Sequence, residues 1–173
     1  MGLISILTEN KNQVTKEILD KKLNKTTTGH IVNGTGRAED VNPSQLQNLI
    51  ESLDSKQCLC LGVVEAEGLD TYDIGPNKKI QRTQKHFSYP TGLPGWLLLD
   101  FDFAEQNHMS PEQAIHQISK YDSRLSSCNK VVSYSASSFL YDSDSGEKLN
   151  NFDNFHIYIE MEDGADIPRY VRS

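Results

Sequence analysis

The most constraining feature of the sequence is an uninterrupted apolar run that ends in two aspartates. Residues 96–99 read Trp-Leu-Leu-Leu, and Asp100, Phe101 and Asp102 follow directly. Because successive side chains of a strand point to opposite faces, a continuous apolar run predicts a strand that is buried on both faces. The fold must therefore supply cover on both sides of this strand, which favours a sheet with helices packed on it.

The two acids suggest a metal site at the end of this strand. Residues i and i+2 of a strand point to the same face, so Asp100 and Asp102 are expected to lie side by side. Two neighbouring carboxylates repel each other unless a cation lies between them. Mg²⁺ and Mn²⁺ take such oxygen ligands, commonly with substrate phosphates, as in two-metal phosphoryl transfer. A solvated strand end is the alternative interpretation.

The remaining elements predict an α/β or α+β fold in a single domain, residues 1–173. Asn42 and Ser110 each read as a helix cap, with a proline next and a glutamine three residues on. A third helix opens at 166–168. Buried or alternating apolar patterns predict strands at four places, with a long connection over 67–94: 58–66, 95–103, 131–141 and 155–161.

Polar side chains on two of these strands are candidates for contact with phosphate. His156 lies on the polar face of the strand at 155–161, where it is able to donate a hydrogen bond to a phosphate oxygen. A solvated surface histidine is the simpler alternative. Alternating serines in the strand at 131–141 either hold a phosphate or face water: Ser133, Ser135 and Ser137.

Charge and cysteine content limit the other possibilities. The net charge of −7 argues against strong, non-specific nucleic-acid binding by the whole surface, although a local basic groove is compatible with it. Cys58, Cys60 and Cys128 have neither a disulfide nor a zinc spacing and are interpreted as small buried hydrophobes. Such cysteines fit the reducing cytoplasm. No apolar run approaches the ~20 residues that a membrane span needs.

The order of these motifs resembles that of the archaeo-eukaryotic primase superfamily. The chain looks most like the primase–polymerase domains of large replication proteins from plasmids, phages and integrated mobile elements. The matching stretches cover nearly the whole chain: 4–7, 59–62, 82–83, 86–90, 97–102, 131–132, 135–138, 145–147, 156–159 and 163–169. The resemblance implies a primase-type catalytic module with helices packed on a mixed, RRM-like sheet.

The resemblance also implies a role for each candidate residue. Asp100 and Asp102 would bind the divalent metals, Mg²⁺ or Mn²⁺. His156 would bind the triphosphate of the incoming nucleotide, with Ser135 and Ser137 as its serine partners.

Other partners follow from the same resemblance. Arg82 would meet the template or a phosphate. The implied partners are a single-stranded DNA template, nucleoside triphosphates and a helicase domain in the same or a neighbouring chain.

Three departures from the family pattern accompany these assignments. Phe139 stands near a position where relatives carry glycine, and residues 151–155 replace a second glycine. The third family carboxylate lies on a later strand, and the sequence ends at Ser173, inside the helix that opens at 166–168. We therefore expect this chain to lack the C-terminal strand and to be nearly inactive alone.

Two other functions remain open from the sequence. The same scaffold is compatible with a non-catalytic module that binds nucleic acid or a replication partner. A D-x-D motif is also compatible with a metal-dependent nuclease or another nucleotidyl transferase.

Overall fold

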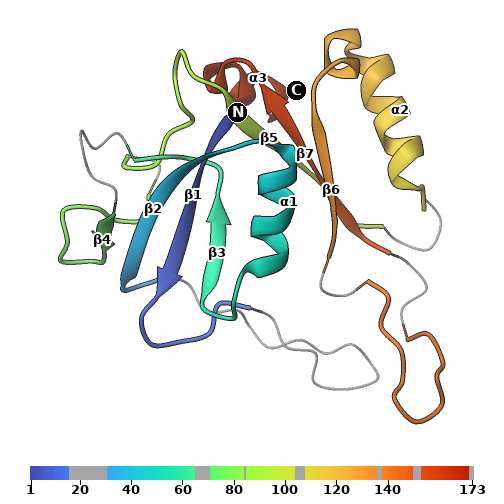
Figure 1. Cartoon of the computed structure of the whole chain (residues 1–173), viewed down its shortest axis with the longest axis horizontal. Helices are drawn as coiled ribbons and strands as arrows, with labels where there is room; N and C mark the ends of the chain where they lie inside the picture. The colour runs from blue at the N-terminus through green and yellow to red at the C-terminus, as the bar shows by residue number, and fades with distance from the viewer. Residues whose placement is uncertain are drawn as a thin grey trace. The chain divides into compact units, whose positions relative to one another are not determined.

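The computed structural model describes residues 1–15, 31–64, 71–83, 85–103, 108–135, 138–149 and 153–171. Over these residues the protein is a mixed α+β fold, with three α-helices and a mostly antiparallel seven-stranded sheet (Figure 1). The chain forms two compact units. The first unit takes its described residues from 1–15, 31–97 and 160–171, and the second unit takes them from 98–159.

Strand β1 (Gly2–Glu9) organises the first unit. Along its whole length it pairs antiparallel with β2 (Gly34–Val41), which pairs in turn with β4 (Tyr72–Ile74). The other edge of β1 is shared by β3 (Gln57–Cys60), which is antiparallel to it, and by the first residue of β5 (Gly95–Phe101), which is parallel to it. The sequence analysis predicted neither β1, β2 nor β4, and β4 lies inside the stretch that was interpreted as a connection.

The second unit contains the hairpin-like pair β6 (Lys130–Tyr134) and β7 (Phe155–Met161), whose last two residues belong to the first unit. The two strands are antiparallel, and their register places Ser133 opposite His156. Strand β7 lies between β6 and β5 in the sheet. Strand β6 is shorter than predicted, because residues 138–149 form an arm that is closed by the Tyr141–Lys148 bridge.

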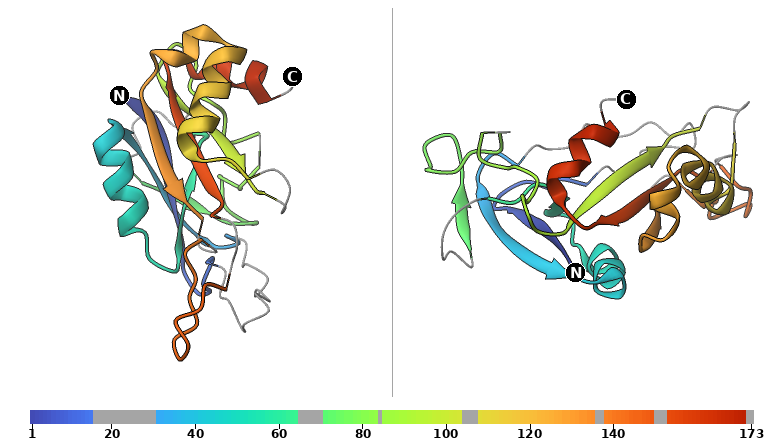
Figure 2. Two further views of the ribbon diagram at one scale, coloured as in Figure 1. Left: turned by 90° about the vertical axis from the view of Figure 1, so that its right-hand side faces the viewer. Right: turned by 90° about the horizontal axis from the view of Figure 1, so that it is seen from above.

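The helices begin where the sequence predicts. Helix α1 (Pro43–Ser52) and helix α2 (Pro111–Tyr121) both start with a complete capping box. In a capping box the cap side chain accepts the N–H of the third helical residue, whose own side chain accepts the N–H of the cap. Helix α2 lies beside β6 and β7 (Figure 2). A short helix α3 (Ile167–Val171) follows a 3₁₀ turn at Gly164–Asp166.

The core of the first unit lies beside β3 and β4. Its buried cluster comprises Leu7, Ile31, Tyr72, Ile74 and Ile80, and Cys58 and Cys60 pack against this cluster. Both cysteines are half-buried and free, as small apolar side chains would be. No helix among the described residues is long and apolar enough to cross a membrane.

Candidate functional site

Asp100 on β5 and His156 on β7, both in the second unit, are in contact. The Asp100 Oδ1 and His156 Nε2 atoms are 3.2 Å apart, and the contact becomes an ion pair when the imidazole is protonated. The Asp100 side chain is 57% exposed and that of His156 31%, so solvent and ligands can reach both. Two of the residues that the sequence analysis selected therefore meet at one surface.

The direction of the Asp102 side chain is set by the aromatic residues that alternate with the two acids. Phe101 and Phe103 both pack on the fully buried Phe155, with ring centroids 5.0 Å and 5.5 Å from it. Side chains of an extended chain alternate between faces, so two phenylalanines on one face direct the two aspartates to the other. Asp102 is exposed there, just after the end of β5.

Asn154 connects the segments around this surface, and the sequence analysis missed it. Its side-chain Oδ1 accepts the N–H of Phe103 at 3.0 Å, directly after Asp102. Its main-chain oxygen accepts the N–H of Ser135 at 2.8 Å and the hydroxyl of Ser138 at 2.7 Å. The only sequence signal is its position, two residues before His156 and on the same expected strand face.

The candidate serines differ in their positions. Ser133 is the strand partner of His156, so the two side chains point to the same face. Ser135 lies just beyond β6, and its hydroxyl is 3.5 Å from that of Ser138. Ser137 lies outside the described residues. Ser133 is therefore the serine that the strand register places nearest the imidazole.

Tyr158 shares the strand face of His156 and lies close to Asp100. The ring is buried, and burial raises the pKa of Tyr158 above its ordinary value of 10.0. The negative charge of Asp100 raises this pKa further. The phenol therefore stays protonated at neutral pH and adds a neutral hydroxyl to this face.

Phe139 has a backbone conformation that favours glycine. Its φ angle is 55°, the only positive φ of a non-glycine residue in the described part of the chain. Its ring packs on Tyr134 at 4.7 Å between centroids, and the Lys148 ammonium lies 5.5 Å from its centroid. The sequence analysis expected a glycine near this position from the resemblance to the primase superfamily. The bulky ring is accommodated by lying on the surface, 47% exposed.

The donor set at Asp100 and Asp102 fits a magnesium-type ion that keeps water or phosphate ligands. No group of three or more His, Cys, Asp or Glu side chains able to hold a metal ion occurs among the described residues. A site made only of protein ligands is therefore not formed there. Mg²⁺, however, is commonly held by one or two carboxylates, with waters and substrate phosphates completing its coordination.

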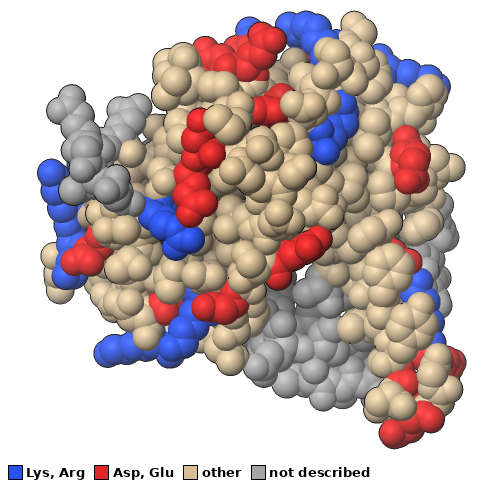
Figure 3. Space-filling model, viewed as in Figure 1, with Lys and Arg blue, Asp and Glu red and all other residues tan. Residues whose placement is uncertain are grey.

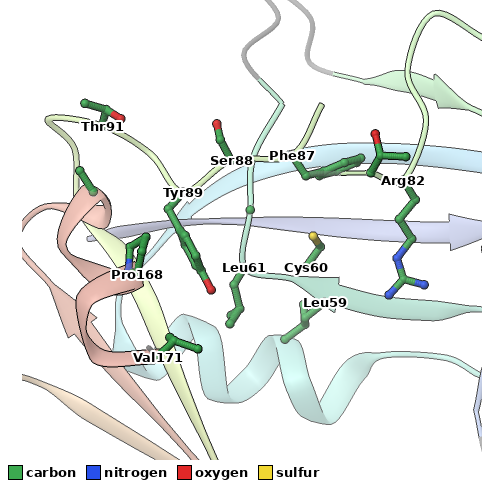
Figure 4. Close-up of a pocket in the computed structure, with 13 residues that line it drawn as sticks. Leu59, Cys60, Leu61, Arg82, Phe87, Ser88, Tyr89, Thr91, Pro168 and Val171 are labelled. Atoms are coloured by element: carbon green, nitrogen blue, oxygen red, sulfur yellow. The ribbon is translucent and has the colours of Figure 1, made fainter. Parts of the chain in front are cut away.

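Arg82 lies in a different place, a pocket of about 840 Å³ in the first unit. The pocket is lined by the end of β3, the segment at 82–91 and α3 (Figure 4). Among the described residues that line the pocket, Arg82 is the only one with a full charge: the others are Leu59, Cys60, Leu61, Gly62, Thr83, Phe87, Ser88, Tyr89, Thr91, Ala165, Pro168 and Val171.

Charged side chains are interspersed on the face of the molecule that Figure 3 shows. Acidic and basic groups alternate over it, and the described Lys and Arg residues do not gather into one basic patch there. Electrostatic attraction of a polyanion to this face therefore has no obvious centre.

Comparison with known proteins does not change this picture. No protein-family model matches the chain, and no significantly similar curated protein or solved structure was found.

Proposed function

We propose that the second unit carries a nucleotidyl-transfer site of the primase–polymerase type, serving replication of a mobile element. The contact between Asp100 and His156 supports this proposal most directly. These residues are 56 positions apart in the sequence. They belong to two of the stretches on which the resemblance to the primase superfamily rests, 97–102 and 156–159. A primase-type module with an RRM-like sheet is the finer description that we propose for the α+β fold.

Each residue has a distinct role in this proposal. Asp100 and Asp102 hold Mg²⁺ or Mn²⁺, which when bound neutralises phosphate charge and favours attack by a 3′-hydroxyl. His156 donates its Nε2–H to Asp100 in the free protein and to a phosphate oxygen of the nucleotide in the complex. Ser133, its strand partner, adds a hydroxyl on the same face.

The partners in this proposal are a single-stranded DNA template and nucleoside triphosphates, in the cytoplasm. A helicase domain, in the same or a neighbouring chain, would supply the opened strand. The face shown in Figure 3 carries no basic patch among its described residues, so we propose that template contact there depends on the metal-bound nucleotide as well as on the protein.

The first prediction concerns metal binding at the two aspartates. Electron paramagnetic resonance of free Mn²⁺ should show saturable binding that tightens when a nucleoside triphosphate is added. Asp100→Asn and Asp102→Asn should each weaken it by about tenfold or more, because a charged ligand becomes neutral. Asp144→Asn, which removes the same charge from the exposed turn of the arm, should bind Mn²⁺ like the wild type.

His156→Gln separates nucleotide binding from metal binding in the same assay. His156→Gln should leave the Mn²⁺ affinity of the free protein nearly unchanged. It should reduce the increase in Mn²⁺ affinity that a nucleoside triphosphate causes in the wild type. Equal Mn²⁺ binding by the wild type and both aspartate variants would contradict the proposal. Where turnover is measurable, extension of a labelled primer distinguishes polymerisation from cleavage by a nuclease.

A further inference from the structure

We propose that the pocket of the first unit binds a planar organic anion, with its acidic group at Arg82 and its ring beside Tyr89. This ligand site goes beyond the nucleotidyl-transfer site and uses neither of its acids nor its histidine. It also gives Arg82 a ligand outside the nucleotidyl-transfer site, in place of the template or nucleotide phosphate that the resemblance implies.

The charge of the pocket selects an anion. Arg82 is exposed, and no described residue forms a hydrogen bond or ion pair with its guanidinium. Burial raises the pKa of the Cys60 thiol, and burial likewise raises that of the Tyr89 phenol, so both groups are neutral at pH 7. Among the described lining residues the Arg82 guanidinium is thus the one charged group on the wall, and its fork of N–H groups matches a carboxylate or a phosphate.

The apolar part of the pocket, from its middle to the end opposite Arg82, favours a ring. In Figure 4, Arg82 and Val171 lie on opposite sides, with Tyr89 and Leu61 between them. Aromatic and aliphatic walls bind planar apolar groups. A ligand that reaches from Arg82 to Val171 therefore needs an acidic head and an apolar body. The volume of about 840 Å³ is within the range of small-molecule sites, roughly 300–1,000 Å³.

The wall nearest β3 is fixed by backbone hydrogen bonds. Val63 and Ser88 exchange N–H···O bonds of 2.8 Å and 3.1 Å, which tie the end of the β3 segment to the segment of Tyr89. Gly62 packs so closely that an added Cβ would lie 3.2 Å from the backbone of Phe87. This wall is therefore formed before any ligand arrives.

The wall that carries α3 is fixed in the same way. The Gly164 N–H donates to the Leu93 oxygen at 2.9 Å, and the Gly92 N–H donates to the Asp163 carboxylate at 2.9 Å. A Cβ on Gly164 would lie 2.5 Å from the Pro90 oxygen, so only glycine permits this approach. Both walls are thus preorganised, which reduces the ordering cost of binding.

The test uses probes that carry one or both of these features. Binding of 1-naphthyl phosphate, 1-naphthoate, 1-naphthol and inorganic phosphate to the whole chain is measured by calorimetry and naphthyl fluorescence. Both naphthyl anions should bind saturably, whereas naphthol and inorganic phosphate should bind at least about tenfold more weakly. The tighter of the two anions identifies the head group.

Two variants and two controls decide the assignment. Arg82→Ala should weaken the binding of both anions by about tenfold and leave the binding of naphthol unchanged. Val171→Glu places a carboxylate at the apolar end of the pocket and should also weaken the binding of both anions. Lys85→Ala removes a nearby exposed cation that does not line the pocket, and it should bind like the wild type. Asp100→Asn should also bind like the wild type, so that this proposal and the nucleotidyl-transfer proposal succeed or fail separately.

Three results would overturn the assignment. These are the absence of saturable binding by either anion, equal binding by Arg82→Ala and the wild type, and an equal loss in Lys85→Ala. Circular dichroism of each variant checks that its fold is retained.

Discussion

Glu9 is the most buried charged residue in the described part of the chain. Only 2% of its surface is exposed, at the end of β1. Its carboxylate accepts the N–H groups of Val32 at 2.7 Å, Asn33 at 3.2 Å and Lys11 at 3.3 Å. Burial alone raises the pKa of Glu9, but these donors outweigh it and hold the pKa below the ordinary 4.5.

Replacing this carboxylate should change the pH dependence of stability. Because the folded pKa of Glu9 is lowered, its contribution is complete above about pH 4.5 and is lost as the pH falls through the folded value. Glu9→Gln should therefore lower the free energy of unfolding by about 1–2 kcal/mol at pH 7 and by less near pH 3. Urea unfolding at several pH values measures the difference.

Glu162→Gln is the matched control for this measurement. It removes one exposed carboxylate from the same unit and should change stability little at any pH. A constant difference between Glu9→Gln and the wild type from pH 7 to pH 3 would contradict the assigned role of Glu9.

At the scale of elements, the sequence predicted what local patterns encode. The cap, proline and glutamine at Asn42 and Ser110 located both longer helices, because these residues satisfy the first N–H groups of a helix through local contacts. The apolar runs and alternation located β5 and β7. These signals depend on neighbours in sequence and need no tertiary contact.

Two of the three missed strands, β2 and β4, have weak local signals and depend on distant partners, whereas β1 has an apolar pattern that was overlooked. Strand β2 reads Gly-Thr-Gly-Arg-Ala-Glu-Asp-Val, with few residues that favour strands. All eight of its residues pair with β1, and this pairing outweighs its weak local preference. Strand β4 has three residues, too few for a periodic signal. Such pairings are not readable from one sequence.

In the candidate site, too, a local pattern was predicted and a contact between distant segments was missed. The alternation of acids and phenylalanines predicted that Asp100 and Asp102 share a face, because alternation is a local property. The contact of His156 with Asp100 was an expectation from motif order. Asn154 was missed, since its side chain acts on a backbone N–H 51 residues away.

Asn154 should influence metal binding without being a ligand. Asn154→Ala removes the acceptor for the Phe103 N–H, which should lower the free energy of unfolding by about 1 kcal/mol. The segment that carries Asp102 should then be less ordered, and Mn²⁺ affinity should fall by severalfold. Thermal unfolding and the Mn²⁺ resonance assay measure the two effects.

Gln117→Ala, on the exposed side of α2 in the same unit, is the control for Asn154→Ala. It should alter neither stability nor Mn²⁺ binding appreciably. Unchanged Mn²⁺ affinity in Asn154→Ala, despite a measurable loss of stability, would show that Asn154 has only a structural role.

At the scale of the whole molecule, the charge of −7 opposes attraction of nucleic acid. Fluorescence anisotropy of a labelled single-stranded oligonucleotide should show little binding at an ionic strength of about 0.15 M without divalent ions. Mn²⁺ with a nucleoside triphosphate should increase the binding, and Asp100→Asn should abolish that increase.

The same anisotropy assay also shows when the prediction fails. Strong binding without a divalent ion, falling steeply with salt, would reveal a basic surface that acts alone. The proposal that the metal-bound nucleotide contributes to template contact would then be wrong.

The D-F-D-F segment, residues 100–103 at the end of β5 and just beyond it, divides its side chains between the core and the solvent. Its phenylalanines contact the core through Phe155, whereas its aspartates are exposed, and exposed charged groups generally contribute little to stability. Mutational drift can therefore remove either acid at small cost to the fold, so that a copy released from selection for the proposed activity would persist as a well-folded protein. Conversely, a scaffold of this kind can regain or exchange acidic residues at these two positions without first being restabilised.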